Sequence, residues 1–306
     1  MTRREWHPEM NTHRLLDHLS VTLSVIMTGQ KKFFRDDTAC ANFPEILGAI
    51  GLDGGSIRGE GRQEVQAKGP AETIDPAYLV AQWLGPDWPT LIYHHGNGER
   101  PFDFGPLTKN TFNRIVMKHR QVFKANLIVL RAPWHQSLRV YLDRIGRLQA
   151  FVTMLATSVL LAEHLIQDLR ARGSPRIVLC GASLGGWVTN LHRAHFDTAD
   201  VYAPIMAGAA LDEVFITSAF RRLVGPAGRR NPDDLRRVLN FEREFATRTR
   251  PNVQALLMRH DAFIDYHRQV RCYDPAKATV LDKGHTTGAL SFSEMRSFLL
   301  SSLSDP

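Results

Sequence analysis

Short, almost continuously apolar runs alternate with longer stretches of helical periodicity along most of the 306-residue chain. Apolar residues at consecutive positions are typical of strands that are buried on both faces, as in a parallel sheet. The alternation therefore predicts an α/β protein built around such a sheet. Strands are expected at 63–67, 78–83, 90–94, 126–131, 176–180, 201–206, 254–258 and 279–281.

Helical periodicity marks segments between these strands and at both ends of the chain. Apolar residues from Leu15 to Ile26 recur at helical spacing and predict a helix near the N-terminus. Further helices are predicted at 138–172, at 187–195 and at the C-terminus, where the pair Ser291 and Glu294 has the spacing of a capping box.

Two segments depart from the alternation of strands and helices. Residues 1–55 precede all of the expected strands, and we interpret them as a helical N-terminal extension to a main domain at 56–306. Residues 211–250 contain arginine pairs and two expected helices, and we interpret them as a small helical insertion. This insertion would cover the C-terminal edge of the sheet, where open α/β sheets bind their ligands.

The most specific motif is Gly-Ala-Ser-Leu-Gly at 181–185, which follows a predicted strand and precedes a predicted helix. A serine between glycines on a strand–turn–helix is the pattern of a nucleophile elbow. Side chains at Gly181 and Gly185 would collide with the strand and the helix. The turn would also place the Ser183 hydroxyl at a helix N-terminus, whose dipole favours negative charge. We predict Ser183 as a nucleophile; the alternative is a glycine-rich turn with an incidental serine.

A serine hydroxyl needs a neighbouring base before it becomes a nucleophile. His285 and Asp261 each follow a strand in the last third of the chain, in the order nucleophile, acid, base. His285 would accept the Ser183 proton, and Asp261 would orient the imidazole and stabilise its charged form. The alternative acids are Asp200, Asp265 and Asp282, and the alternative bases are His260 and His267.

The loop that follows the strand at 90–94 begins with the sequence HHGNG. We predict the backbone N–H groups of Asn97 and Leu184 as the two donors of an oxyanion hole, each worth on the order of 3 kcal/mol in the transition state. His95 and Gly96 are predicted to contact the substrate. Since neighbouring residues at a strand end point in opposite directions, the two histidines are not expected to bind one metal ion.

Taken together, these motifs resemble the α/β-hydrolase superfamily over about residues 75–303. The resemblance implies a mostly parallel eight-stranded sheet with helices on both faces, a lid after the sixth strand and no cofactor. It also implies an esterase, lipase, thioesterase, acyltransferase or peptidase. The stretch RAPWHQSLR resembles an APxxGxR-like loop of one branch, with Gln136 in place of glycine, and some relatives in that branch are thought to act on lipid acyl esters.

Charge narrows the possible partners. The chain has 38 Lys and Arg against 31 Asp and Glu, which gives a net charge of +7. Because the sequence contains no nucleic-acid-binding motif, nucleic acid is not expected as a partner in spite of this positive charge. Residues 211–250 hold nine arginines and six acids, a net charge of +3. These arginines could bind an anionic group of the substrate, contact an anionic membrane surface or form a solvated helical face.

Three widely spaced cysteines form no CxxC pair, which argues against a disulfide framework or a zinc ribbon and favours a reducing compartment. No apolar run reaches about 18 residues, so no membrane-spanning helix is expected. Arg3 and Arg4 precede an apolar stretch that is interrupted by polar residues and lacks a cleavage site, unlike a signal peptide. A cytoplasmic protein is therefore expected.

The sequence thus predicts a serine hydrolase that cleaves the carboxylic ester of a small-molecule substrate through an acyl-enzyme on Ser183, and the resemblance implies that it needs no cofactor. The alternatives are an acyltransferase or thioesterase with the same residues, a peptidase, and a non-catalytic binding protein that has retained the fold.

Overall fold

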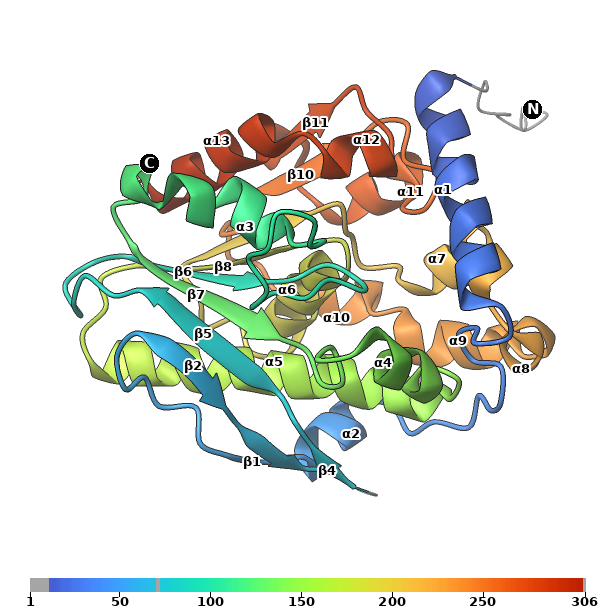
Figure 1. Ribbon diagram of the computed structural model, residues 1–306, viewed down its shortest axis with the longest axis horizontal. Coiled ribbons are helices and arrows are strands. Elements are labelled where there is room, and N and C mark those ends of the chain that lie inside the picture. The colour runs from blue at the N-terminus through green and yellow to red at the C-terminus, as the bar shows by residue number, and fades with distance from the viewer. Residues whose placement is uncertain (1–10, 70–71, 305–306) are drawn as a thin grey trace.

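The computed structural model describes residues 11–69 and 72–304, so Arg3 and Arg4 lie outside the described residues. Its central sheet contains the strands β2 (Gly61–Glu64), β5 (Ala77–Gln82), β6 (Thr90–His94), β7 (Asn126–Arg131), β8 (Ile177–Ala182), β9 (Val201–Ile205), β10 (Ala255–Met258) and β11 (Ala278–Leu281). Their spatial order is β11-β10-β9-β8-β6-β7-β5-β2 (Figure 1). β5 is antiparallel to both of its neighbours, and the other pairs are parallel. The mostly parallel eight-stranded sheet is therefore confirmed.

The predicted strand at 63–67 divides between two sheets. β2 pairs with β5 in the central sheet, whereas β3 (Gln66–Lys68) joins β1 (Gly51–Asp53) and β4 (Thr73–Ile74) in a small antiparallel sheet. The segment predicted as an N-terminal extension therefore supplies a strand to this small sheet.

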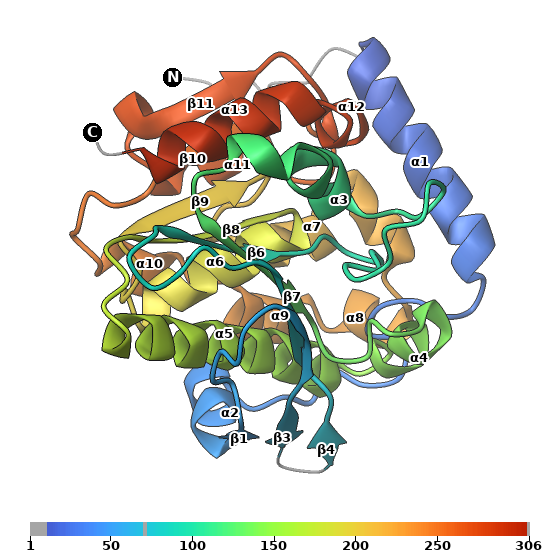
Figure 2. The same cartoon turned by 60° about the vertical axis from the view of Figure 1, so that its left-hand side comes forward.

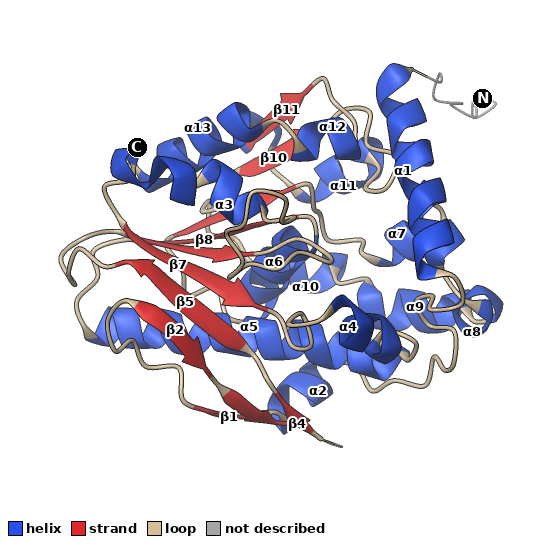
Figure 3. Ribbon diagram, viewed as in Figure 1, coloured by secondary structure: helices blue, strands red, loops and turns tan. Residues whose placement is uncertain are grey.

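Helices cover both faces of the central sheet, as Figures 2 and 3 show. The helices of the described residues are α1 (Thr12–Thr28), α2 (Phe43–Ala49), α3 (Thr111–Ile115), α4 (Leu138–Arg144), α5 (Leu148–Ala171), α6 (Leu184–His195), α7 (Asp212–Ile216), α8 (Pro226–Arg230), α9 (Pro232–Leu239), α10 (Glu242–Ala246), α11 (Tyr266–Gln269), α12 (His285–Ala289) and α13 (Phe292–Leu303), with the 3-10 helices η1 (Met117–Val122), η2 (Ala219–Leu223), η3 (Val270–Cys272) and η4 (Pro275–Lys277). α3 and α13 pack together on one face, and α5 and α6 pack on the other.

The apolar runs of the strands reflect this two-sided covering. In β6, Leu91 and Tyr93 belong to the core cluster that contains Phe112 of α3 and Phe298 of α13. The intervening Ile92 belongs to a second cluster, which lies under the C-terminal half of α5. Since alternate side chains of a strand point to opposite faces, both faces need apolar residues.

α5 is the one helix in the described part of the chain that is long and apolar enough to cross a membrane by length and composition. Of its apolar window, 78% is buried inside the protein. That burial is the pattern of a helix that packs in a core.

The prediction of one continuous helix at 138–172 is wrong, because this range forms two separate helices, α4 and α5. The carbonyl oxygens of Ile145 and Gly146 accept hydrogen bonds from the backbone N–H groups of Phe34 and Asp36, both at 2.9 Å. These bonds to a distant segment replace the bonds that would continue a helix. A side chain at Gly146 would also overlap the Asp36 carboxylate.

The capping box predicted at α13 is also wrong. Ser291 stands at the N-cap position, but its hydroxyl donates to the carbonyl of Thr287 in the preceding helix at 3.1 Å. The carboxylate of Glu294 accepts instead from Ser293 at 2.6 Å. The preceding helix α12 thus offers Ser291 a partner, and the adjacent Ser293 of α13 itself offers one to Glu294, so neither side chain bonds to the cap.

The segment at 211–250 follows β9, the sixth strand of the central sheet in chain order. It forms five short helical elements, α7, η2, α8, α9 and α10, where the sequence predicted two helices. α1 confirms the predicted N-terminal helix and packs against η2 and α12 at the outer edge of the molecule (Figures 1 and 2).

β6 lies between β7 and β8, so the chain passes to opposite sides of β6 in successive crossovers. At such a switch point the loops after neighbouring parallel strands diverge and leave a crevice at the carboxyl edge of the sheet. The loop after β6 and the turn after β8 both begin at this point.

Candidate active site

Ser183 lies on the tight turn between β8 and α6. Its backbone has φ +53° and ψ −112°, a combination that residues other than glycine rarely adopt. A Cβ atom at Gly185 would overlap the carbonyl oxygen of His94, and one at Gly181 would lie 2.5 Å from the backbone carbon of Gly185. The turn thus requires both glycines, and backbone strain of this kind concentrates at functional sites.

The loops after β10 and β11 bring Asp261 and His285 together. The Nδ1 atom of His285 donates to Oδ2 of Asp261 at 2.7 Å. The other carboxylate oxygen of Asp261 accepts the backbone N–H groups of Phe263 and Ile264, both at 2.8 Å. These bonds fix the orientation of the carboxylate, which in turn fixes the proton of His285 on Nδ1 and leaves Nε2 as an acceptor.

The alternative acids have other partners. Asp200 accepts the first backbone N–H of β8 at 2.7 Å, and Asp265 caps the N-terminus of α11. Asp282 pairs with the alternative base His260 at 2.7 Å, in an exposed position. Asp261 is therefore the predicted acid that contacts the predicted base.

Burial alone would lower the pKa of His285. The charge and hydrogen bond of Asp261 act in the opposite direction, the charge of Asp17 adds to them, and together they raise the pKa of His285 above its ordinary value of 6.5. A base with a raised pKa binds a proton more tightly once it has accepted one. It is also neutral, and ready to accept a proton, only above that raised pKa.

Asp17 of α1 is a site residue that the sequence analysis missed. Its side chain is fully buried, and Oδ2 accepts the backbone N–H groups of Ala262 at 3.0 Å and His285 at 2.8 Å. Its Oδ1 accepts the N–H of Thr286 at 2.7 Å. One carboxylate therefore joins the loop that carries Asp261 to the N-terminus of the helix that begins at His285.

We expect Asp17→Asn to lower both the stability of the protein and the pKa of His285. The amide nitrogen of asparagine would face backbone donors, and each unsatisfied donor costs about 1–3 kcal/mol in the free energy of unfolding. Loss of the negative charge removes one cause of the raised pKa of His285. Denaturant unfolding and NMR titration of the His285 ring measure the two effects. Asp87→Asn, an exposed acid on the loop between β5 and β6, is the matched control and should change neither. An unchanged pKa in Asp17→Asn would contradict this account.

The loop after β6 is held by side chains that the sequence analysis also missed. Glu99 is buried, and its Oε2 atom accepts the backbone N–H groups of Gly96 and Thr111, both at 3.3 Å. The Tyr141 hydroxyl donates to the Oδ1 atom of Asn97. Glu99 directly follows the HHGNG motif, so its position in the sequence was the available signal.

Two backbone N–H groups remain open at the edge of the cavity beside Ser183. No hydrogen bond within the described residues involves the N–H of Asn97 or that of Leu184, the first residue of α6. The side chain and the carbonyl of Asn97 are both engaged, the carbonyl by Lys109 at 3.0 Å. The residue is thus fixed while its N–H stays available.

His95 does not have the position predicted for it. It is fully buried and absent from the lining of the cavity, whereas Gly96 does line the cavity. Its Nδ1 atom donates to the carbonyl of Gly96 at 2.7 Å, and its Nε2 atom accepts the N–H of Ala132 at 3.0 Å. Both ring nitrogens are therefore used inside the protein, and His95 supports the loop instead of facing a substrate.

The prediction that the side chains of the two adjacent histidines, His94 and His95, point in opposite directions is wrong as well. The His94 and His95 rings are stacked with centroids 4.9 Å apart, and His135 lies 4.5 Å from His95. β6 ends at His94, so the alternation of a strand does not extend to His95. Burial lowers the pKa of His94 to about 4 and that of His135 to about 3, so both are neutral packing residues at neutral pH. No group of three or more His, Cys, Asp or Glu side chains in the described residues is arranged to hold a metal ion.

A cavity of about 600 Å³ opens over Ser183 and His285. No hydrogen bond joins these two side chains in the described structure, and bonds of this kind often tighten only when substrate is bound. α1 contributes the lining residues Ser20, Ser24, Met27 and Thr28. From 211–250 the cavity is lined by Leu211, Val214, Phe215, Phe220 and Leu223, and by none of the arginines.

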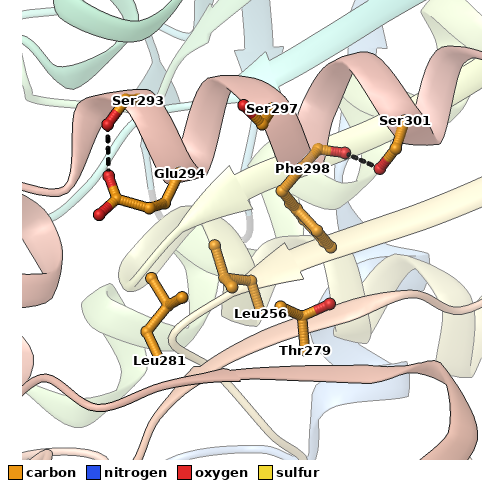
Figure 4. Close-up of a pocket in the computed structure, with 8 residues that line it drawn as sticks. All are labelled: Leu256, Thr279, Leu281, Ser293, Glu294, Ser297, Phe298 and Ser301. Carbon is orange, nitrogen blue, oxygen red and sulfur yellow. Dashed lines mark hydrogen bonds between the residues drawn. The ribbon is translucent and has the colours of Figure 1, made fainter.

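A second hollow of about 470 Å³ lies between α13 and the strands β10 and β11 (Figure 4). Its one ionisable side chain, Glu294, turns to Ser293 of the same helix, and the hydroxyl of Ser301 bonds the carbonyl of Phe298 at 2.8 Å. The lining thus presents no nucleophile paired with a base, in contrast to the cavity over Ser183.

Comparison with known proteins identifies the family. Residues 136–298, just over half of the chain, match the family described as "Uncharacterised protein family (UPF0227)". The chain belongs to the UPF0227 family. The matched range contains Ser183, Asp261 and His285, whereas Asn97 and Asp17 lie before it. No curated protein matches the UPF0227 chain significantly by sequence.

Solved structures show the fold of this UPF0227 chain. Acetyl xylan esterase 1 from Thermoanaerobacterium sp. JW/SL YS485 matches with a TM-score of 0.52 at 13% identity, over 91% of this chain and 98% of that chain. Est1E from Butyrivibrio proteoclasticus matches with a TM-score of 0.51 at 12% identity, over 80% of this chain and 100% of that chain. These likenesses, together with the sheet order, show that the chain has an α/β-hydrolase fold.

Proposed function

We propose that this protein is a serine hydrolase that cleaves carboxylic esters with an apolar acyl chain. The observation that carries the proposal is the meeting of three features at one cavity. These are the strained Ser183 turn, the 2.7 Å pair of Asp261 and His285, and the open N–H groups of Asn97 and Leu184. The proposal also agrees with the esterase names of the two structural neighbours.

In the acylation step the Ser183 oxygen would attack the ester carbonyl carbon while His285 Nε2 accepts the hydroxyl proton. The carbonyl oxygen would become negative in the tetrahedral intermediate, and the Asn97 and Leu184 N–H groups would donate to it. Collapse would then break the bond to the alcohol oxygen, which would leave with the proton from His285. Asp261 would stabilise the imidazolium that exists between these two transfers.

Water would complete the cycle by the same route. His285 would accept a proton from water as the water oxygen attacks the acyl carbon of the Ser183 ester. The second tetrahedral intermediate would break the bond to Ser183, which regains the proton. The acid product and the free enzyme result, and no cofactor takes part.

The lining of the cavity favours an apolar acyl group over a charged one. Phenylalanine side chains come from four different segments: Phe33, Phe151, Phe215 with Phe220, and Phe263. Apart from His285, the one basic residue that lines the cavity is Lys109, whose ammonium group bonds the carbonyl of Asn97. Burial of methylene groups in such a cavity stabilises a bound acyl chain by about 0.8 kcal/mol for each group.

A series of p-nitrophenyl esters with increasing acyl length tests this function. We expect kcat/KM to rise from acetate by up to about fourfold for each added methylene, the rate equivalent of the burial energy, until the cavity is filled. Ser183→Ala supplies the background rate at every length. A rate that falls steadily from acetate onward would contradict the apolar acyl site, and the absence of any ester hydrolysis above background would contradict the hydrolase.

A further inference from the structure

The apolar stripe of α1 faces away from the protein. Side chains of Leu23, Ile26 and Met27 are 61%, 71% and 80% exposed. At 100° for each residue, the exposed apolar positions form one arc of about 120°, and no polar residue between Leu15 and Met27 falls within it. The members of this arc, here called the α1 stripe, are Leu15, Leu16, Leu19, Leu23, Ile26 and Met27.

The polar side of α1 faces the protein, which reverses the usual arrangement of a surface helix. Asp17 is fully buried among the backbone N–H groups of the site loops, and Ser20, Ser24 and Thr28 face the cavity. Val21 on the same side is buried in the core and Val25 packs partly against it, whereas the larger apolar side chains of the helix stay in water. Contiguous apolar surface of this kind marks a site of contact with a membrane or a protein.

The charges beside the α1 stripe are positive. From α1 to Lys32 the described chain contains three cations, Arg14, Lys31 and Lys32, and a single acid, Asp17, which is buried. Lys31 pairs with Asp143 at 2.7 Å. Arg222 of η2 is exposed and donates to the hydroxyl of Thr22 on α1 at 2.9 Å, so a further cation lies beside the stripe.

We propose that the α1 stripe docks on the surface of an anionic lipid bilayer. An amphipathic helix with an apolar face and flanking cations binds in the headgroup region, by burial of apolar area and by attraction to anionic lipids. A symmetric contact between two copies through the same face would bring their cations together, which disfavours a dimer here.

Two exposed leucines extend this surface to the mouth of the cavity. Leu138 and Leu290 are more than half exposed, and both line the cavity over Ser183, as Met27 of the stripe does. A bilayer in contact with α1 would therefore lie beside the opening through which an acyl chain enters. This second part of the proposal, an acyl ester taken from the bilayer as substrate, rests on the proposed function, whereas docking does not.

Sedimentation with vesicles tests the docking. We expect the full-length protein to bind vesicles of phosphatidylcholine with phosphatidylserine, to bind more weakly as salt rises, and to bind phosphatidylcholine alone less well. Leu23→Glu/Ile26→Glu should lower the partition coefficient by at least about tenfold, because two large apolar side chains lose their burial. Leu84→Glu, an exposed leucine at the opposite edge of the sheet, is the matched control and should bind like the wild type.

Three outcomes would overturn the docking: no binding of the wild type to either vesicle, equal binding of Leu23→Glu/Ile26→Glu, or a dimer in light scattering that this variant dissociates while vesicles stay unbound. Hydrolysis of a soluble p-nitrophenyl ester is measured on the same samples. The stripe residues changed here do not line the cavity, so the variant should keep this activity. Vesicle binding without any ester hydrolysis would leave docking intact and contradict the proposed function.

Discussion

Replacing Ser183 with alanine should lower kcat/KM for a p-nitrophenyl ester by at least about 10⁴-fold. Without the hydroxyl, no acyl-enzyme forms, and only binding and the two N–H donors remain to assist attack by water. No ester substrate should escape this loss, since every one would use the same nucleophile.

The protein should fold normally with this change. The Ser183 hydroxyl caps no backbone group of α6, and alanine is smaller than serine, so the turn keeps its glycines and its contacts. The melting temperature and circular dichroism should match the wild type. A variant that is folded and retains more than about a tenth of the wild-type kcat/KM would contradict the assignment of Ser183 as nucleophile.

The second large effect is expected for Asp261→Asn, which should lower kcat by about 10⁴-fold. The backbone N–H groups of Phe263 and Ile264 would hold the amide oxygen of asparagine in place of Oδ1. The amide nitrogen would then face Nδ1 of His285 and donate to it. The imidazole proton would move to Nε2, the atom that must accept the serine proton, so the base would be blocked.

The pH dependence separates this mechanism from simple unfolding. Asp261 raises the pKa of His285, so its loss should lower that pKa and shift the acid limb of the residual kcat/KM profile to lower pH. Asp265→Asn is the control, because Asp265 caps α11 and does not contact His285. A large loss in Asp265→Asn with full activity in Asp261→Asn would overturn the choice of acid.

The strands of the sheet and the turn at Ser183 could be predicted because burial and short-range steric contacts determine them. Strands such as β6 and β7 have the bounds predicted at 90–94 and 126–131, since burial on both faces demands unbroken apolar runs. The turn at Ser183 depends on collisions within a few residues of sequence and with one adjacent strand. Likewise, Asp261 and His285 each follow a strand, and two neighbouring parallel strands end at the same edge.

The supporting contacts could not be predicted because they join distant parts of the chain. Asp17 bonds the N–H of His285 across 268 positions of sequence, and nothing local to the N-terminal helix specifies that contact. Asp17 is the one acid between Thr12 and Lys32, and that was the available signal. The apolar pattern at Leu15 to Ile26 identified a helix correctly, but periodicity alone does not tell which face a helix buries.

The expectation that the side chains of His94 and His95 diverge was wrong for a related reason. It extended strand alternation one residue past the end of β6, where the His95 ring stacks on His94. The arginine-rich segment at 211–250 contributes apolar side chains to the cavity instead of cations. Two of its arginines pair with acids of the same segment, Arg236 with Asp233 at 2.7 Å and Arg237 with Asp234 at 3.9 Å.

The central claim is that Ser183 is a nucleophile activated by His285, and mass spectrometry after treatment with a fluorophosphonate probe tests it most directly. Such a probe forms a stable phosphonyl ester with an activated serine as fluoride leaves. We predict one adduct on the wild-type protein, on the peptide that contains Ser183, and no adduct on Ser183→Ala or on the peptide of any other serine. An unlabelled wild type, or an adduct that persists in Ser183→Ala, would contradict the account.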